Sequence, residues 1–194
     1  MSVLGELQPN KVFKYFEEIC SIPHGSRNLQ QISDYLVDFA KAHELKYRQD
    51  EDLNVIIWKD GSKGYEASEP VILQGHMDMV AVKEADCDKD MEKEGLDLEI
   101  NGDYISAKGT SLGGDDGIAV AYTLAVLDDE EMAHPPIEAI FTVNEEIGML
   151  GAATIDVSDL KGRLFMNMDS EDEGVFTVSC AGGASVICKI PYET

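Results

Sequence analysis

Acidic side chains and a histidine stand directly after several apolar runs of this sequence. His76 and Asp78 follow VILQG, Glu145 and Glu146 follow the run that ends in FTV, and Asp169 follows LFMNM. Carboxylate oxygens with some imidazole are ligands that zinc, cobalt or manganese accept in proteins. Because a metal-competent side chain recurs after each run, the pattern predicts a metal centre.

The glycine-rich run SLGGDDG adds Asp115 and Asp116 to these candidates. The run lacks the Lys-Ser/Thr pair of a phosphate-binding P-loop, and two aspartates would repel a phosphate group. A helix N-terminus favours carboxylates, so either aspartate could simply cap the helix that follows. Capping needs only one of them, and the other could bridge two cations. The spacing leaves open which aspartate does which.

His76 and Asp78 are two positions apart, so they share one face of an extended segment. A carboxylate in that place can orient the imidazole of a metal-bound histidine. The alternative is that His76 is a core histidine with a satisfied hydrogen bond. That alternative does not explain why Asp78 stands two positions later. His43 lies at a polar helix end and His134 precedes a Pro-Pro turn. We expect these two histidines, and His24, to be structural or solvated.

Adjacent glutamates at the end of a strand suggest two different tasks. Two cations about 3.5–4 Å apart can share one carboxylate, hold a water between them and polarise a carbonyl. A carboxylate beside the metals must still take the water's proton and pass it to the leaving amine. Glu145 and Glu146 could divide these tasks. Asp169 directly follows a buried run, whereas the acids at 171–173 fit a solvated loop.

The elements that must position these side chains alternate between strand and helix. The order predicts an α/β fold, with a mostly parallel sheet flanked by helices. In such sheets, ligands bind beyond the carboxyl ends of the strands. LDLEINGDYISA alternates around Asn101-Gly102, which indicates a hairpin. The predicted buried strands are 53–58, 71–75, 137–143 and 164–168. Helices are predicted at 9–20 and 115–129, and another helix is predicted to begin near Asn28, which would cap it.

Composition restricts the partners of this chain. Lys and Arg total 15 against 38 Asp and Glu, which gives a net charge of -23. The electrostatic field of this negative charge repels phosphate backbones and anionic lipid headgroups. We therefore expect neither nucleic acid nor a membrane surface as a partner. The sequence contains no G-x-G-x-x-G, which disfavours a dinucleotide-binding domain.

The cysteines at positions 20, 87, 180 and 188 show no C-x-x-C spacing. Scattered thiols in a chain without a signal peptide indicate a reducing cytoplasm. Cys180 and Cys188 lie in apolar runs, so we expect them in the core rather than on a metal. SVICKIPYET reads as the opening of a new strand.

Four segments in order resemble a known family. QGHMDMV, GTSLGGDDGIAVA, TVNEEIGMLGA and NMDSEDEG with the later SCAGG are similar to co-catalytic metallopeptidases of the aminoacylase and carboxypeptidase G type. DSEDEG and CAGG favour the branch of aminoacyl-histidine dipeptidases, which cleave Xaa-His dipeptides. The resemblance runs from ICSIPHGS to SCAGG, nearly the whole chain. Each motif alone is moderately specific, and the four together are strongly so.

The resemblance implies a zinc-exopeptidase-like α/β/α sandwich, a small-peptide substrate and two divalent cations, zinc first, with cobalt or manganese as alternatives. It implies a dinuclear metal-activated water that attacks the peptide bond. In the implied roles, His76 and Asp169 bind one cation, Asp115 bridges both, Glu146 binds the second, Glu145 is the general base and acid, and Asp78 orients His76.

Members of the family are much longer than this chain and carry a lid domain that often mediates dimers. We therefore expect residues 1–183 to be the first part of a catalytic domain, truncated before the lid is completed, and 184–194 to begin that lid. A final histidine ligand would then lie outside the sequence, and the isolated 194 residues should be weakly active or inactive. The alternatives are a non-catalytic metal-binding or scaffold protein of the same fold, or another small-peptide or acyl-amino-acid hydrolase of the family.

Overall fold

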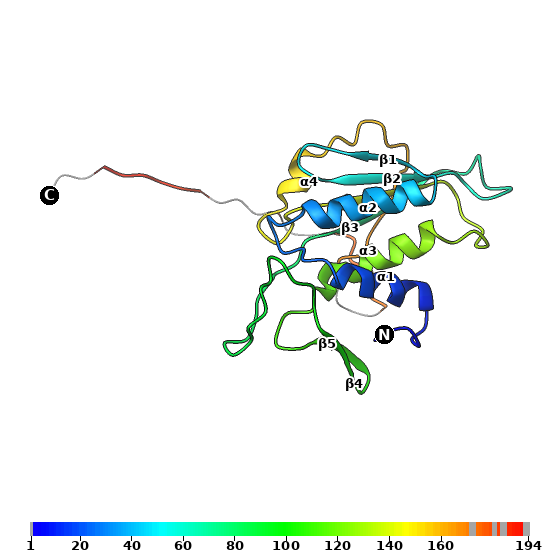
Figure 1. The fold of residues 1–194 in the computed structure, drawn as a ribbon. Coiled ribbons are helices and arrows are strands. Elements are labelled where there is room, and N and C mark those ends of the chain that lie inside the picture. Colours follow the sequence, from blue (N-terminus) through cyan, green and yellow to red (C-terminus); the bar gives the residue numbers. More distant parts are fainter. Residues whose placement is uncertain (1, 171–173, 180–181, 183–185, 192–194) are drawn as a thin grey trace.

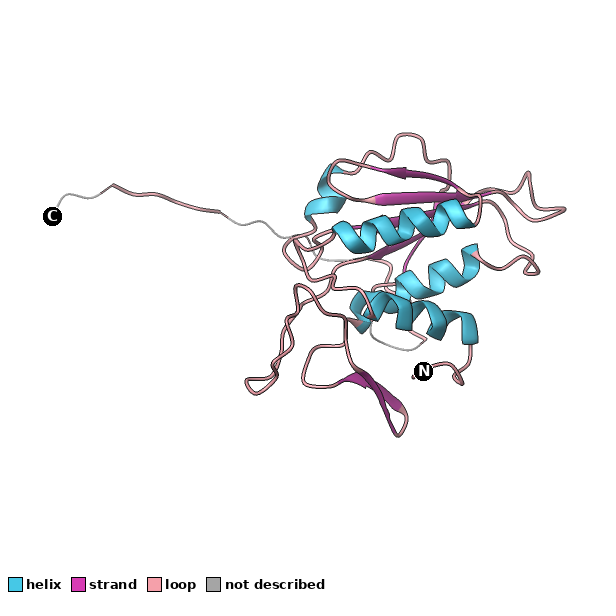
Figure 2. Cartoon of the chain, in the orientation of Figure 1, coloured by secondary structure: helices cyan, strands magenta, loops and turns pink. Residues whose placement is uncertain are grey.

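The structure of the protein is a computed structural model that describes residues 2–170, 174–179, 182 and 186–191 (Figure 1). In the described part of the chain, two helices come first and five strands follow, and from residue 114 onward helices and strands alternate. A two-stranded hairpin extends from the main body (Figure 2). The elements are α1 (Asn10–Cys20), α2 (Gln30–Ala42), β1 (Lys46–Gln49), β2 (Val55–Lys59), β3 (Val71–His76), β4 (Leu98–Asn101), β5 (Tyr104–Ala107), α3 (Gly114–Leu127), β6 (Ile137–Thr142), α4 (Leu150–Thr154) and β7 (Leu164–Asn167).

The main sheet has the strand order β1-β2-β6-β3-β7. β3 runs parallel to both β6 and β7, whereas β2 runs antiparallel to β1 and to β6. The carboxyl ends of β3, β6 and β7 therefore meet at one edge of the sheet. The segments that follow these strands contain most of the candidate residues, so the parallel part of the sheet builds the site.

The long helices bury their apolar residues on one side of the sheet, with α2 against β1 and β2, α3 against β3, and α1 against α3. α1 presents Val12, Phe16 and Ile19 to the core, and each of these side chains is almost completely buried. α3 lies between α1 and β3 in the packing, and its small residues Ala119 and Ala121 allow a close approach to the strand. This packing fixes the start of α3 beside the end of β3.

On the other face of the sheet, the segment after α4 approaches β3 and β6. The backbone N–H groups of Lys161 and Gly162 donate to the buried carboxylate of Glu138 in β6. β7 is the last strand in the order, and one of its edges has no strand partner among the described residues. Leu164 and Phe165 of β7 are 58% and 54% exposed.

The α/β fold with flanking helices that the sequence predicts is confirmed, and the hairpin turns at Gly102 with φ 63° as the Asn-Gly signal indicates. The sheet is mixed, because β1 and β2 add antiparallel pairings. The short, exposed strand β1 was not predicted, since KYRQ carries no buried apolar pattern. In the described part of the chain, no helix is long and apolar enough to cross a membrane.

Four local predictions were wrong. Residues 164–167 form the strand β7, but all four are exposed rather than buried. Asn28 does not cap α2, because α2 begins at Gln30 and the Asn28 side chain donates instead to the carbonyl of Glu92. Residues 186–191 form no strand, and Cys188 is exposed rather than part of the core. An apolar run forms a buried strand only where a neighbouring strand or helix covers it, and none of the described elements covers this one. Cys180 lies outside the described residues.

Candidate metal centre

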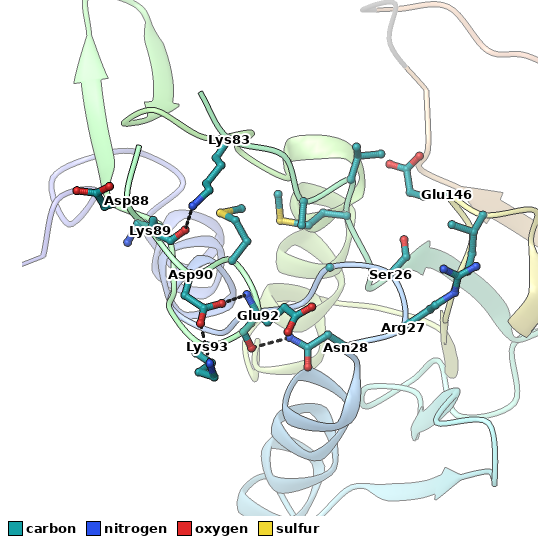
Figure 3. A pocket seen from close by; sticks show the side chains of 16 residues that line it. Ser26, Arg27, Asn28, Lys83, Asp88, Lys89, Asp90, Glu92, Lys93 and Glu146 are labelled. Carbon is teal, nitrogen blue, oxygen red and sulfur yellow. Dashed lines mark hydrogen bonds and ion pairs between the residues drawn. The ribbon is translucent and has the colours of Figure 1, made fainter. Parts of the chain in front are cut away.

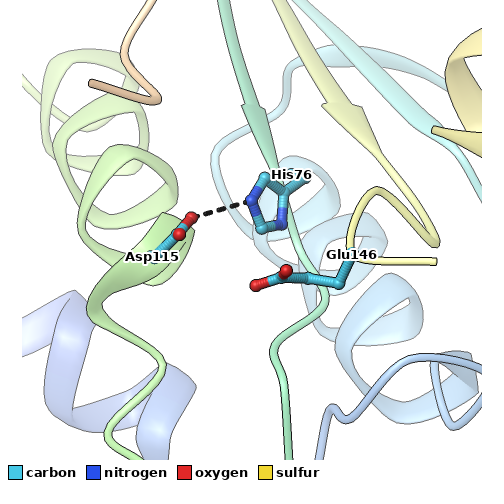
Figure 4. A group of neighbouring side chains, drawn as sticks. All are labelled: His76, Asp115 and Glu146. Carbon is cyan, nitrogen blue, oxygen red and sulfur yellow. Dashed lines mark hydrogen bonds and ion pairs between the residues drawn. The ribbon is translucent and has the colours of Figure 1, made fainter. Parts of the chain in front are cut away.

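His76 is the last residue of β3, and its side chain is 1% exposed. Its Nδ1 lies 2.9 Å from the backbone carbonyl oxygen of Asp78, to which it can donate. With Nδ1 engaged in this way, Nε2 is the ring nitrogen that can bind a cation. Nε2 lies 3.0 Å from the Oδ1 atom of Asp115, and Figure 4 shows this pair with the carboxylate of Glu146 below the ring.

The two aspartates at the start of α3 have different surroundings. Their φ/ψ angles are non-helical and the peptide bond between them is cis. The side chain of Asp115 is 65% exposed and points at His76. Asp116 is 2% exposed, and its Oδ2 accepts from the backbone N–H of His76 at 3.1 Å. Asp115 therefore lies toward the site, and Asp116 ties the start of α3 to β3.

Carboxylates from the ends of β6 and β7 complete the cluster. Glu145 and Asp169 each have a carboxylate oxygen 3.9 Å from Nε2 of His76. Possible ligand atoms of His76, Asp115 and Glu146 lie within 4.8 Å of one another, as do those of His76, Glu145 and Asp169. Four sequence-predicted carboxylates are thus brought together around the imidazole of His76. Glu171, Asp172 and Glu173 lie outside the described residues.

Both glutamates reach the site because the chain turns after β6. Asn144 has φ 54°, and the N–H groups of Gly148 and Met149 donate to the carbonyl of Glu145. The strict alternation of side chains along a strand ends where this turn begins. Neighbouring carboxylates can therefore approach the cluster from different directions.

Asp78 contacts more than the histidine that the sequence assigns to it. Its Oδ1 is 3.6 Å from Nδ1 of His76 and accepts from the N–H of Glu145 at 3.0 Å. Its Oδ2 accepts from the hydroxyl of Ser26 at 2.8 Å and from the N–H of Glu146 at 3.4 Å. Ser26 was not among the predicted residues, because a serine in a loop far upstream carries no periodic or motif signal.

The charges of the cluster shift the pKa values of its members. Burial acts to lower the pKa of His76, but the carboxylates of Asp78, Asp116 and Asp115 outweigh it and raise the pKa to about 10. Burial raises the pKa of Asp116 to about 7, against the effect of the His76 charge. Burial and repulsion between carboxylates also raise the pKa of Glu145, which is 31% exposed.

Glu146 and Asp169 have raised pKa values for the same reasons, burial first and the carboxylate of Asp115 second. Crowded carboxylates around one imidazole repel one another unless a proton or a cation lies between them. A donor set of one imidazole and several carboxylate oxygens matches the ligand preferences of zinc or manganese. The residues present therefore fit a divalent cation.

An open cavity of about 1070 Å³ adjoins the cluster at Glu146 (Figure 3). One wall is the loop that contains Ser26, Arg27 and Asn28, and another is the segment around Lys89 and Lys93. The cavity is large enough for a small peptide.

The remaining histidines lie outside the cluster. His24 is buried and its Nδ1 lies 2.6 Å from the carbonyl oxygen of Ile22, and burial lowers its pKa. His43 stacks on Phe39, and Nδ1 of the buried His134 lies 2.8 Å from the carbonyl oxygen of Pro135.

Several known proteins resemble this chain over most of its length, although no protein-family model matches it. It is 40% identical over 183 residues to the cytosol non-specific dipeptidase of Escherichia coli, an alignment that covers 94% of this chain and 38% of that protein. The chain thus spans well under half the length of this relative.

Solved structures agree with this comparison. The aminoacylhistidine dipeptidase from Vibrio alginolyticus superposes with a TM-score of 0.85 at 40% identity, covering 88% of this chain and 35% of that one. A tripeptidase from Staphylococcus aureus shares the fold, with a TM-score of 0.70 at 23% identity over 87% of this chain and 45% of that one. The resemblance to the aminoacyl-histidine dipeptidases that the motifs indicate is therefore confirmed across nearly the whole of this chain.

Proposed function

We propose that the full-length protein containing this chain is a metal-dependent dipeptidase that cleaves Xaa-His dipeptides. The observation that carries the proposal is the convergence of two groups that share His76. One contains Asp115 and Glu146 and the other contains Glu145 and Asp169, and the possible ligand atoms within each group lie within 4.8 Å of one another. The similarity to a dipeptidase of Escherichia coli and to an aminoacylhistidine dipeptidase of Vibrio alginolyticus supports peptide hydrolysis.

Four residues would hold two divalent cations, with zinc as the first choice and cobalt or manganese as alternatives. His76 and Asp169 would bind one cation, Asp115 would bridge both, and Glu146 would bind the second. When bound, such cations polarise a peptide carbonyl and lower the pKa of a water. The carboxylate of Asp116 accepts a hydrogen bond from the backbone of β3, so we assign the bridging position to Asp115.

Glu145 would move the protons. Its carboxylate would take a proton from the attacking water and deliver it to the nitrogen of the leaving amine, so that the free amino group departs neutral. Burial and the neighbouring carboxylates raise the pKa of Glu145, which favours its holding a proton between these two transfers. Asp78 would keep Nδ1 of His76 engaged and so hold Nε2 toward the site.

The substrate and the cellular setting are also proposals. The name of the Vibrio relative supports a Xaa-His preference, whereas that of the Escherichia relative supports a wider range of dipeptides. We place the protein in the cytoplasm, as a possible homodimer. Residues 1–183 would belong to the catalytic domain and 184–194 would lead into the lid domain.

The test uses the full-length protein loaded with zinc and a panel of Xaa-His and Xaa-Ala dipeptides. Glu145→Ala should keep bound zinc and lose turnover by at least roughly 100-fold, the scale of a general base. Glu130→Gln, on the exposed turn after α3, is the control and should leave turnover unchanged. Retained turnover in Glu145→Ala removes this residue from the mechanism. A wild-type protein without bindable zinc favours the scaffold alternative.

A further inference from the structure

The buried carboxylate of Asp78 binds the backbone on which both glutamates stand. The Asp78 side chain is 0% exposed, so its charge must be satisfied by protein groups. The N–H of Glu145 and the N–H of Glu146 both donate to it, at 3.0 Å and 3.4 Å. Two successive N–H groups directed at one carboxylate fix the orientation of the peptide unit between the two glutamates.

The hydroxyl of Ser26 makes the shortest hydrogen bond to this carboxylate, at 2.8 Å. Burial alone would raise the pKa of Asp78, but contacts with His76, the Glu145 N–H and Ser26 lower it, so the group is held as an anion. Ser26 occupies Oδ2, which otherwise has only the long 3.4 Å bond to Glu146. Without the hydroxyl, one oxygen of a buried anion would be nearly unpaired.

The same loop holds the turn after β6 through a second bond. The N–H of Arg27 donates to Oδ1 of Asn144 at 2.8 Å, directly before Glu145. The loop itself is fixed to the segment after β3, because the N–H of Ser26 donates to the carbonyl of Met79 and the N–H of Met79 to that of His24. The loop at residues 24–27 therefore connects the end of β3 to the turn after β6.

We propose that Ser26 and Asn144 are positioning residues, which set the directions of Glu145 and Glu146 through the carboxylate of Asp78 and the turn backbone. This inference rests on the proposed function, in which one glutamate holds a cation and its neighbour moves a proton. Adjacent residues can divide these tasks only if the peptide unit between them keeps one orientation. Figure 3 shows Ser26 on the loop beside Glu146.

Kinetics of the full-length, zinc-loaded protein provide the first readout. Ser26→Ala should lower kcat by roughly 10- to 100-fold, with KM within about twofold and zinc content unchanged, as for other groups that orient a metal site. Ser26→Thr keeps the hydroxyl and should recover most of kcat. Ser21→Ala is the matched control, because its hydroxyl donates only to the nearby carbonyl of Glu18.

Asn144→Gly acts on the other side of the turn and tolerates the positive φ of that position. It should lower kcat in the same way, which keeps the proposal open to refutation if Ser26→Ala fails to fold. Unchanged kcat in both variants overturns the inference. Equal losses in Ser26→Ala and Ser26→Thr also overturn it, since they would show that packing and not the hydroxyl matters.

Amide hydrogen exchange gives a second readout that needs no activity. Ser26→Ala should speed exchange at the N–H groups of Glu145 and Glu146 at least tenfold and leave exchange in β1 unchanged. Unaltered exchange overturns the proposed positioning, whatever the turnover. If the wild type hydrolyses no dipeptide but exchange responds as expected, the proposed function fails and the hydrogen-bonded link from Ser26 to the glutamates remains.

Discussion

At the scale of single residues, the two aspartates at the start of α3 show how neighbours of the same type acquire different chemistry. The side chain of Asp115 lies at His76 Nε2 and is mostly exposed, whereas Asp116 is buried and accepts from the backbone of β3. The sequence places both at a helix start, and helix dipole arguments treat them alike. Only the path of the backbone separates them.

Asn substitutions should separate these roles. Asp115→Asn removes a charged ligand and should weaken zinc binding by at least roughly tenfold. Asp116→Asn keeps an oxygen that can accept from the His76 N–H, so zinc affinity should stay within about threefold of wild type. Competition titration with a zinc chelator measures both. A larger loss in Asp116→Asn than in Asp115→Asn would contradict the division.

Zinc affinity should rise with pH through the neutral range. The pKa of His76 in the metal-free protein is raised to about 10, because the surrounding carboxylates outweigh burial. Below that pH the imidazole is protonated, and a cation must displace the proton before it can bind. Apparent affinity should therefore increase about tenfold per pH unit if one proton is displaced. Titrations between pH 6 and 8 test this, and a flat profile would contradict it.

The sequence could identify most residues of the candidate site but not all of their contacts. His76, Glu145 and Asp169 lie at or just after the ends of predicted strands, so topology alone places them at one edge. The hydrogen bonds that the Asp78 carboxylate accepts from groups other than His76 could not be predicted. Their donors are the hydroxyl of Ser26 and backbone N–H groups in a turn. Such contacts depend on backbone angles at single residues, which no periodic pattern encodes.

At the scale of elements, β3 and α3 contact each other at Gly75, a residue of β3 without a side chain. A Cβ atom on Gly75 would lie 2.8 Å from Oδ2 of Asp116 and 3.0 Å from the Cβ of Ala119. The glycine therefore lets the start of the helix approach the strand that ends in His76. Strands with buried apolar runs were predictable, whereas this close approach and the exposed strand β1 were not.

Gly75→Ala should disturb both stability and the site. The added methyl group must push against α3, which should lower the free energy of unfolding by about 1–3 kcal/mol and weaken zinc binding. Gly117→Ala is the matched control, because its Cβ would meet Phe16 at an ordinary 3.4 Å and alanine favours a helix. Urea unfolding measures the difference. Equal effects of the two substitutions would refute the role of the contact.

At the scale of the whole molecule, a strongly acidic chain carries an apolar strand at its sheet edge. The net charge is -23, and Leu164, Phe165 and Met166 of β7 are 58%, 54% and 43% exposed. Unpaired edges with apolar side chains promote association, whereas like charge opposes it. Solution behaviour of the 194-residue chain is set by the balance of these two effects.

Added salt should therefore shift the isolated chain toward association. Screening shortens the reach of charge repulsion to about 8 Å at 0.15 M ionic strength and leaves the apolar contact intact. Phe165→Lys should reduce the association, and Tyr104→Lys, on the exposed hairpin, should not. Light scattering at low and moderate salt measures the effect. If both variants associate as the wild type does, β7 is not the contact.

The groups that meet at His76 come from distant parts of the chain, since Asp169 follows β7 and Asp115 lies in the first turn of α3. A cation held between His76 and Asp169 would act as a cross-link that closes a long loop of the polypeptide. Such a link removes chain entropy from the unfolded state, and its effect grows slowly with the length of the loop. Chelation of the cation should therefore lower the melting temperature of the protein. The end of β7 should then unfold before the helical core does.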